Sequence, residues 1–91
     1  MVIQVTYTDI EEGNKSFDAC PVTIALRREF KNNKISVSRN FIRVPKRSTK
    51  DWKLIPLPAA AREFLLNYYL YLSPQPFIFV VPKKDISALK G

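Results

Sequence analysis

Histidine is absent from the 91-residue chain, which also has a single Cys and only two Gly. The missing imidazole removes the commonest general acid or base near neutral pH and the commonest metal ligand. Zinc would depend on Cys20 and scattered carboxylates, so neither a metal nor another cofactor is expected. A single Cys excludes an internal disulfide and favours a reducing compartment. Because the chain has no His to act as its base, Cys20 is better interpreted as a small buried residue than as a reactive thiol. These absences favour a protein that is not an enzyme.

Long hydrophobic runs are missing as well. The longest apolar stretch, Phe64 to Leu72, is interrupted by Asn67 and is too short to span a bilayer. No charged-then-apolar amino-terminal segment resembles a secretion signal. We therefore expect a soluble, cytoplasmic protein without a membrane partner. Hydrophobic residues still make up 46% of the chain, which predicts a folded domain rather than a disordered chain.

Positive charge is concentrated in one segment. Ten of the 15 Lys and Arg residues lie between Arg27 and Lys53, where only Glu29 and Asp51 oppose them, so this segment has a net charge of +8. The residues before it carry −3 and those after it carry +2, which gives +7 for the chain. Because a concentrated positive field attracts polyanions, this distribution is the strongest functional signal in the sequence.

Alternating and helical hydrophobic patterns predict an α+β fold. Strands are expected over 2–8, 34–38, 41–44 and 77–81, helices over about 20–31 and 57–72, and a further short strand is compatible with Leu54-Ile55. This order predicts one sheet of about four strands covered by two helices, and a ferredoxin-like topology fits it. Residues 1–82 would form the single compact domain, and residues 83–91 a polar C-terminal tail.

The same patterns predict which faces are buried. In the first strand, Ile3, Val5 and Tyr7 would face the core. The acidic segment from Asp9 to Ser16 is interpreted as a solvated turn, because no metal-ligand spacing follows it. The continuous apolar run from Phe77 to Val81 predicts a strand buried on both faces.

Interleaved cations and aromatic residues make the basic segment a candidate nucleic-acid-binding surface. Arg and Lys would contact phosphates, while aromatic rings would stack on the bases of a single strand. The candidate residues are Arg27, Arg28, Lys31, Lys34, Arg39, Phe41, Arg43, Lys46, Arg47, Lys50 and Trp52. Neither an RNA-recognition consensus nor a helix-turn-helix pair is present, so binding would be largely independent of sequence. The alternative is that these cations only solvate one face and that Phe41 belongs to the core.

The second predicted helix is apolar on more than one side. Leu66, Tyr69 and Leu70 lie opposite its core face, which is typical of contact with a partner or with a second copy of the chain. The alternative is that the C-terminal tail, through Ile86 and Leu89, folds back over them.

The first predicted helix begins with Cys20-Pro21-Val22, followed by Ala25-Leu26-Arg27-Arg28. Further along the chain come Leu57-Pro58, Ala61, Phe64 and the run Pro74-Gln75-Pro76-Phe77. This combination resembles a pattern in small uncharacterised proteins of bacteria and their phages. The resemblance brings no assigned activity, but it implies a prokaryotic or mobile-element origin. That origin raises a second hypothesis, a phage-type protein-binding inhibitor of a host nucleic-acid-targeting complex that resembles the anti-CRISPR proteins.

Overall fold

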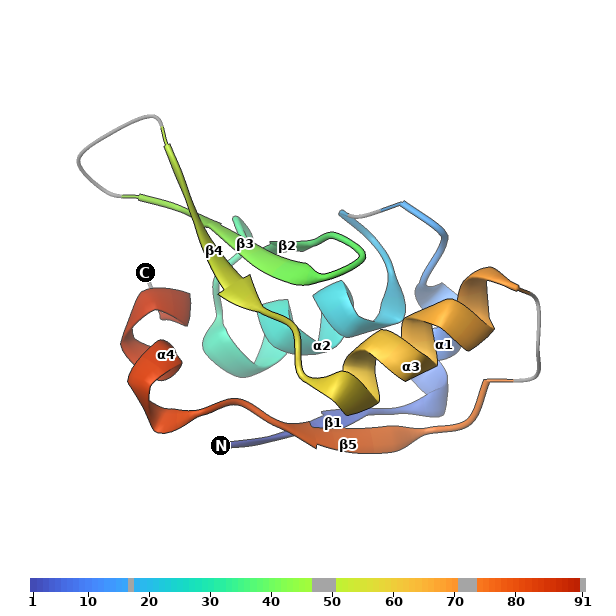
Figure 1. Cartoon of the computed structure of the whole chain (residues 1–91). Coiled ribbons are helices and arrows are strands. Elements are labelled where there is room, and N and C mark those ends of the chain that lie inside the picture. The colour runs from blue at the N-terminus through green and yellow to red at the C-terminus, as the bar shows by residue number, and fades with distance from the viewer. Residues whose placement is uncertain (17, 47–50, 71–73, 91) are drawn as a thin grey trace.

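The computed structural model describes residues 1–16, 18–46, 51–70 and 74–90. Figure 1 shows its elements along the chain. They are β1 (Val2–Val5), α1 (Tyr7–Glu12), α2 (Pro21–Phe30), β2 (Ser36–Val37), β3 (Phe41–Pro45), β4 (Trp52–Pro56), α3 (Ala59–Tyr69), β5 (Phe77–Val80) and α4 (Lys83–Leu89).

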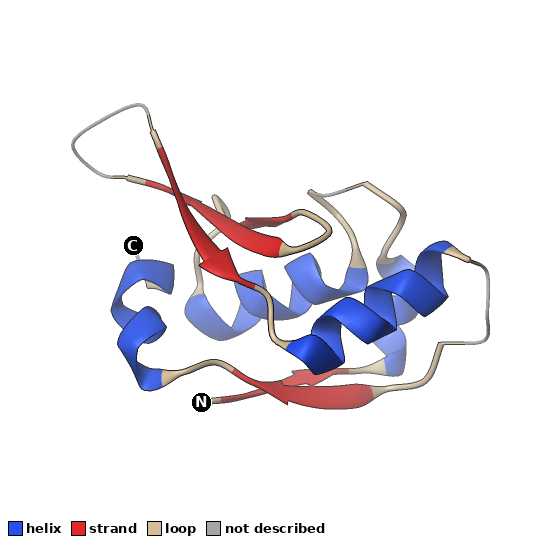
Figure 2. Ribbon diagram, viewed as in Figure 1, coloured by secondary structure: helices blue, strands red, loops and turns tan. Residues whose placement is uncertain are grey.

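Two separate antiparallel sheets enclose the helices α2 and α3. β1 pairs with β5 in one sheet, and the other contains β2, β3 and β4 in that order. In Figures 1 and 2 the three-stranded sheet lies above the helices and the two-stranded sheet lies below them. α2 contacts both β1 and β2, and α3 contacts β5, so the helices form the middle layer of the molecule.

The position of α2 between two sheets explains why six of its ten residues are buried. Val22, Ala25, Leu26 and Phe30 are buried, as the helical pattern predicts, and Thr23 is buried as well. Pro21 suits the first turn of the helix, where its missing N–H would have no helical partner. The helix ends at Phe30, because the next residue adopts the left-handed conformation.

The inner faces of the two sheets complete the core around this helix. Ile3 lies opposite Phe79 in one sheet, and Ile42 lies opposite Ile55 in the other. All four side chains are buried. Burial of apolar surface from both sheets against one helix is the main stabilising contribution to the fold.

The α+β class is confirmed, but the predicted single sheet is not what the structure has. The described residues contain four helices and five strands in two sheets. Met1 and Val81 exchange two backbone hydrogen bonds, of 2.9 and 2.8 Å, so the antiparallel alternation points the backbone groups of Gln4 away from β5. There the Gln4 carbonyl accepts a hydrogen bond of 2.8 Å from Arg28 Nη2. A side chain thus occupies part of the edge on which another strand would have to pair.

The first strand is also shorter than predicted, because the chain turns into α1 at Thr6. Thr6 Oγ1 accepts a hydrogen bond of 3.2 Å from the backbone N–H of Asp9, and Asp9 Oδ2 accepts one of 3.0 Å from the N–H of Thr6. This reciprocal pair is a capping box, which begins a helix. Ile3 and Val5 face the core as expected, whereas Tyr7 lies on α1 and is exposed. The predicted solvated turn is therefore wrong at its start, where Asp9 is buried.

β5 is not buried on both faces, contrary to the prediction. Phe79 faces the core, but Ile78 and Val80 are exposed. The helices cover only one face of the two-stranded sheet, and alternate residues of a strand point to opposite faces. Val2, which pairs with Val80, is exposed beside them, so this outer face carries an apolar strip.

The segment expected as a polar tail contains α4, which packs onto the core. Leu89 is fully buried, and its backbone carbonyl accepts a hydrogen bond of 2.9 Å from Asn32 Nδ2. This contact brings the last turn of α4 beside the end of α2. α4 does not cover the outer side of α3, since Leu66 and Leu70 are exposed.

Candidate nucleic-acid interface

Four lysines from distant parts of the chain line one surface depression of about 380 Å³. These residues, the lysine cluster, are Lys31, Lys34, Lys46 and Lys90. Lys31 is the C-cap of α2 and Lys90 is the C-cap of α4, while Lys46 directly follows β3. The hydrogen bond between Asn32 and the end of α4 explains why the two helix ends meet here.

The electrostatics of the lysine cluster favour an anion. Among the described residues that line the depression there is no Asp or Glu. Two helix C-termini meet there, and each contributes a partial charge of about −0.5, against four positive side chains, so a net charge of about +3 remains. Lys31 and Lys90 also stabilise those helix ends, a structural use that does not extend to Lys34 and Lys46.

The outer face of the β3–β4 pair carries exposed aromatic and apolar side chains. Phe41 and Arg43 point outward from β3, and their neighbours on β4 include Trp52 and Leu54. The Arg43 guanidinium lies 4.6 Å from the centroid of the Trp52 ring, a cation–π contact that steadies both side chains. The Trp52 side chain remains 43% exposed, so part of its surface is open to a ligand. This hairpin face, defined by these four residues, ends next to Lys46.

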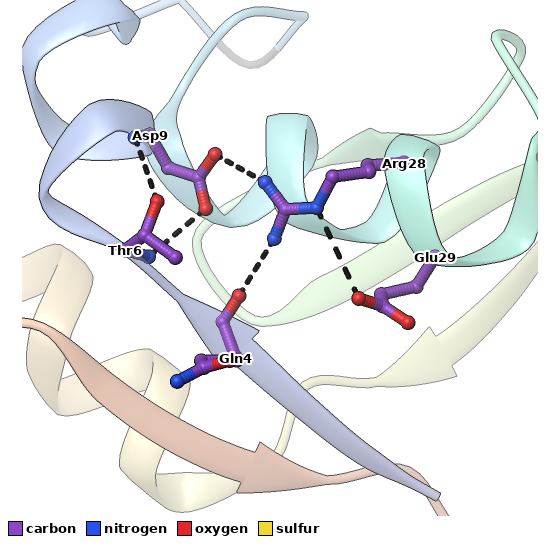
Figure 3. A network of polar contacts seen from close by, with 5 residues as sticks. All are labelled: Gln4, Thr6, Asp9, Arg28 and Glu29. Carbon is purple, nitrogen blue, oxygen red and sulfur yellow. Dashed lines mark hydrogen bonds and ion pairs between the residues drawn. The ribbon is translucent and has the colours of Figure 1, made fainter.

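Arg28 has a structural role that the sequence does not reveal (Figure 3). Its Nη1 donates to Asp9 Oδ1 at 2.5 Å and its Nη2 donates to the Gln4 carbonyl. Asp9 is 2% exposed, and its hydrogen bond to Arg28 raises the pKa of the guanidinium. A more distant contact of 3.9 Å joins Arg28 to Glu29. Arg28 therefore neutralises a buried carboxylate and connects α1 to α2.

The remaining cations do not all converge on the lysine cluster. Arg27 Nε donates to the Ile35 carbonyl at 2.7 Å, so this side chain fixes the loop after α2. Arg39 precedes β3, at the opposite end of that strand from Lys46, and lines a groove with Leu66, Tyr69 and Leu70. Arg47 and Lys50 lie outside the described residues. The basic segment thus divides into a lysine cluster, a hairpin face and a groove.

Two residues of this surface were not predicted from the sequence. Lys90 reaches the cluster only through the packing of α4, and nothing in its local sequence indicates that. Leu54 is exposed beside Arg43, and its place could have been predicted by extending the alternation of β4.

Cys20 is buried and lies 3.1 Å from the Thr23 hydroxyl. Burial raises the pKa of its thiol, with the Thr23 hydrogen bond opposing, so little reactive thiolate forms near neutral pH. In the described part of the chain, no group of three or more Cys, Asp or Glu side chains is placed to hold a metal ion.

Comparisons of the chain with protein-family models, with curated proteins and with solved structures find no match. Among the described helices, none has the length and apolarity that crossing a bilayer requires. Function is therefore inferred from the geometry of the described surface.

Proposed function

We propose that this protein is a small, non-enzymatic nucleic-acid-binding accessory protein that holds single strands without regard to sequence. The observation that carries the proposal is the lysine cluster, four cations drawn from distant segments around one depression, next to the exposed hairpin face. Phosphates would bind the lysine cluster, and bases would stack on Trp52 and Phe41. Arg43 would add a cation beside the stacked bases.

The chemistry of the two surfaces favours single strands over duplexes. A base can stack on an exposed ring only when its own face is free, as in unpaired nucleic acid. Lysines act as point charges rather than as planar forks, so they contact phosphates without selecting a base. Sequence-independent binding follows from both features.

The charge count sets the expected salt dependence. If all four cluster lysines neutralise a phosphate, the logarithm of the binding constant should fall with the logarithm of salt concentration with a slope of about −3 for a single strand. Each lysine removed should reduce the steepness of that slope by about 0.7.

Trp52 makes the test direct, because it is the only Trp in the chain. Its emission should be quenched when an oligothymidylate is added at low salt and should recover when salt is raised. Unchanged emission, together with unchanged anisotropy of a fluorescein-labelled oligothymidylate, would reject the proposal.

Charge variants then locate the site. K31N, K34Q, K46Q and K90Q each remove one cluster charge, and Asn suits position 31, where φ is 50°. K83Q and K84Q are the matched controls, since they remove exposed charges from the other end of α4. The cluster variants should weaken binding of the labelled oligothymidylate and flatten its salt slope more than the controls do. Equal effects would mean that only net charge matters.

Trp52→Ala tests the stacking contribution separately. This variant should also weaken binding of the labelled oligothymidylate, because stacking contributes about 1–3 kcal/mol per base.

A second candidate is the protein-binding inhibitor, of the kind that the anti-CRISPR proteins exemplify. It is favoured by Leu66 and Leu70, whose side chains are 57% and 59% exposed on α3. Co-purification with a host complex that is lost in Leu66→Asp, but kept in K34Q, would support it. A homodimer stays a prediction for light scattering to test, because exposed apolar residues occur both here and on the outer face of β1 and β5.

A further inference from the structure

A groove lies between α3 and the turn that precedes β3. Its volume is about 300 Å³, and its lining comprises Arg39, Asn40, Arg62, Leu65, Leu66, Tyr69 and Leu70. At about 30 Å³ for each water molecule, the space equals about ten waters, which is enough for one large amino-acid residue. It shares no lining residue with the lysine cluster.

The charges of the groove have the same sign and are not neutralised by the described residues. Arg39 comes from the turn and Arg62 from α3, and neither forms an ion pair with a described residue. The leucines provide an apolar surface within the same space. An occupant would therefore need a negative charge and an apolar body, held close together.

Tyr69 also lines the groove, and the environment of its hydroxyl is unusual. Its hydroxyl oxygen is buried, yet it has no hydrogen-bond partner within the described structure. Burial raises the pKa of Tyr69, and the positive charge of Arg39 opposes that rise, so Arg39 lies within electrostatic reach of the hydroxyl. A buried hydroxyl without a partner is unfavourable unless something else completes its hydrogen bonding.

We propose that this groove captures the C-terminal residue of a partner polypeptide when that residue is apolar. The carboxylate would bind between Arg39 and Arg62, and the side chain would pack on Leu65 and Leu66. The arginines and the leucines line the same small groove, and a chain-terminal apolar residue offers both a negative charge and an apolar group within one residue. A free amino acid also carries an ammonium group, which the two arginines would repel. Leu66 and Leu70 extend the apolar surface outward, where the preceding residues of the peptide would lie.

The proposal goes beyond nucleic-acid binding and uses other residues. Its test is calorimetric titration with the peptide acetyl-Ala-Leu-Phe, compared with the same peptide as its C-terminal amide. The free acid should bind, and the amide should bind at least tenfold more weakly, because it lacks the charge that both arginines face. Equal affinities for acid and amide would overturn the proposal.

Protein variants make the test specific. The double variant R39Q/R62Q should lose at least tenfold in affinity for the acid, while R39K/R62K should retain part of it, since Lys keeps the charge without the planar fork. K83Q/K84Q removes the same amount of charge from α4 and should bind the peptide as the unaltered protein does. Arg39 and Arg62 are exposed, so these variants should fold, which circular dichroism checks.

Two further outcomes are decisive. If 4-phenylbutyrate binds as tightly as the peptide, a small free acid is the ligand and the polypeptide source is wrong. Oligothymidylate binding should be unchanged in R39Q/R62Q, so the groove and the lysine cluster can fail separately. Loss of peptide binding in K34Q/K46Q but not in R39Q/R62Q would move the peptide site away from the groove and contradict the proposal.

Discussion

Replacement of Arg28 by Ala should destabilise the fold without affecting nucleic-acid binding. Arg28 is one of ten cations in the basic segment, but it is bonded to buried Asp9 and to the Gln4 carbonyl on the edge of β1. The substitution leaves a carboxylate that is 2% exposed without its cation. Among the described residues, the hydrogen bond that the Asp9 carboxylate then keeps is the one from the Thr6 N–H.

The expected magnitude follows from the exposure of the two partners. Breaking a fully buried pair costs about 3–5 kcal/mol. The Arg28 side chain is 44% exposed, so solvent screening reduces this value, and we expect a loss of about 2–3 kcal/mol in the free energy of unfolding. Asp9→Ala should cost less, about 1–2 kcal/mol, because the remaining guanidinium can turn to water and only the cap of α1 is lost. For a chain of this length with a total stability of about 5–14 kcal/mol, both losses are measurable.

Urea denaturation followed by circular dichroism measures the four members of the double-mutant cycle. Arg28→Ala with Asp9→Ala should cost less than the sum of the single variants by about 1–2 kcal/mol, because the two residues interact directly. An Arg28→Ala protein within about 0.5 kcal/mol of the unaltered one, or strict additivity, would refute the reasoning. Affinity for oligothymidylate, measured where the variant is folded, should change by less than a factor of about two, since a single cation away from the phosphate path adds little.

Three further perturbations test other parts of the structure. Tyr69→Phe removes a buried hydroxyl without a described partner, so the free energy of unfolding should stay constant or rise by up to about 1–3 kcal/mol; a loss in urea denaturation would show that the hydroxyl is satisfied. Burial raises the pKa of the Cys20 thiol above 9.0, so the folded state retains that proton more tightly; stability should be full below pH 9 and fall as pH rises above it, less steeply in Cys20→Ala. Gly13→Ala would place a Cβ 2.7 Å from Pro21 Cδ and 2.9 Å from the Asp9 carbonyl, at an ordinary φ of −72°. This clash should cost about 1–3 kcal/mol in thermal or urea unfolding, and an unchanged midpoint would contradict it.

Local patterns predicted the elements of this fold better than their assembly. The buried face of α2 and its start at Pro21 depend on residues within a few positions of one another, and the sequence contains that information. Which strands pair depends on distant contacts. The edge of β1 is partly occupied by Arg28, 24 residues from Gln4, and no local pattern indicates this. Thr6 and Asp9 are three positions apart, which is the spacing of a capping box, so the start of α1 could have been predicted from the sequence. The β-branched residues before Thr6 favoured a longer strand instead.

The candidate site was likewise predictable where it depends on local patterns, but not where it depends on contacts between distant residues. Phe41, Arg43 and Trp52 could be placed on a surface by alternation, because strand periodicity determines which residues share a face. The lysine cluster depends on α4 packing beside the end of α2, which brings in Lys90 from the C-terminal segment. The contact of Arg28 with Asp9 was not predictable for the same reason, since the two residues are 19 positions apart in sequence.

The lysine cluster and the groove lie at opposite ends of β3, which determines how strongly their charges would interact. Arg39 precedes that strand and Lys46 follows it, and the five residues of β3 between them span about 16 Å. Electrostatic screening reduces interactions between exposed charges beyond about 8 Å at physiological ionic strength. The charges of one site therefore contribute little to binding at the other, so nucleic acid and a polypeptide C-terminus should bind independently. A protein with this arrangement could hold both at once, so the nucleic-acid-binding and protein-binding hypotheses are compatible: the lysine cluster would serve the first and the groove would serve the second.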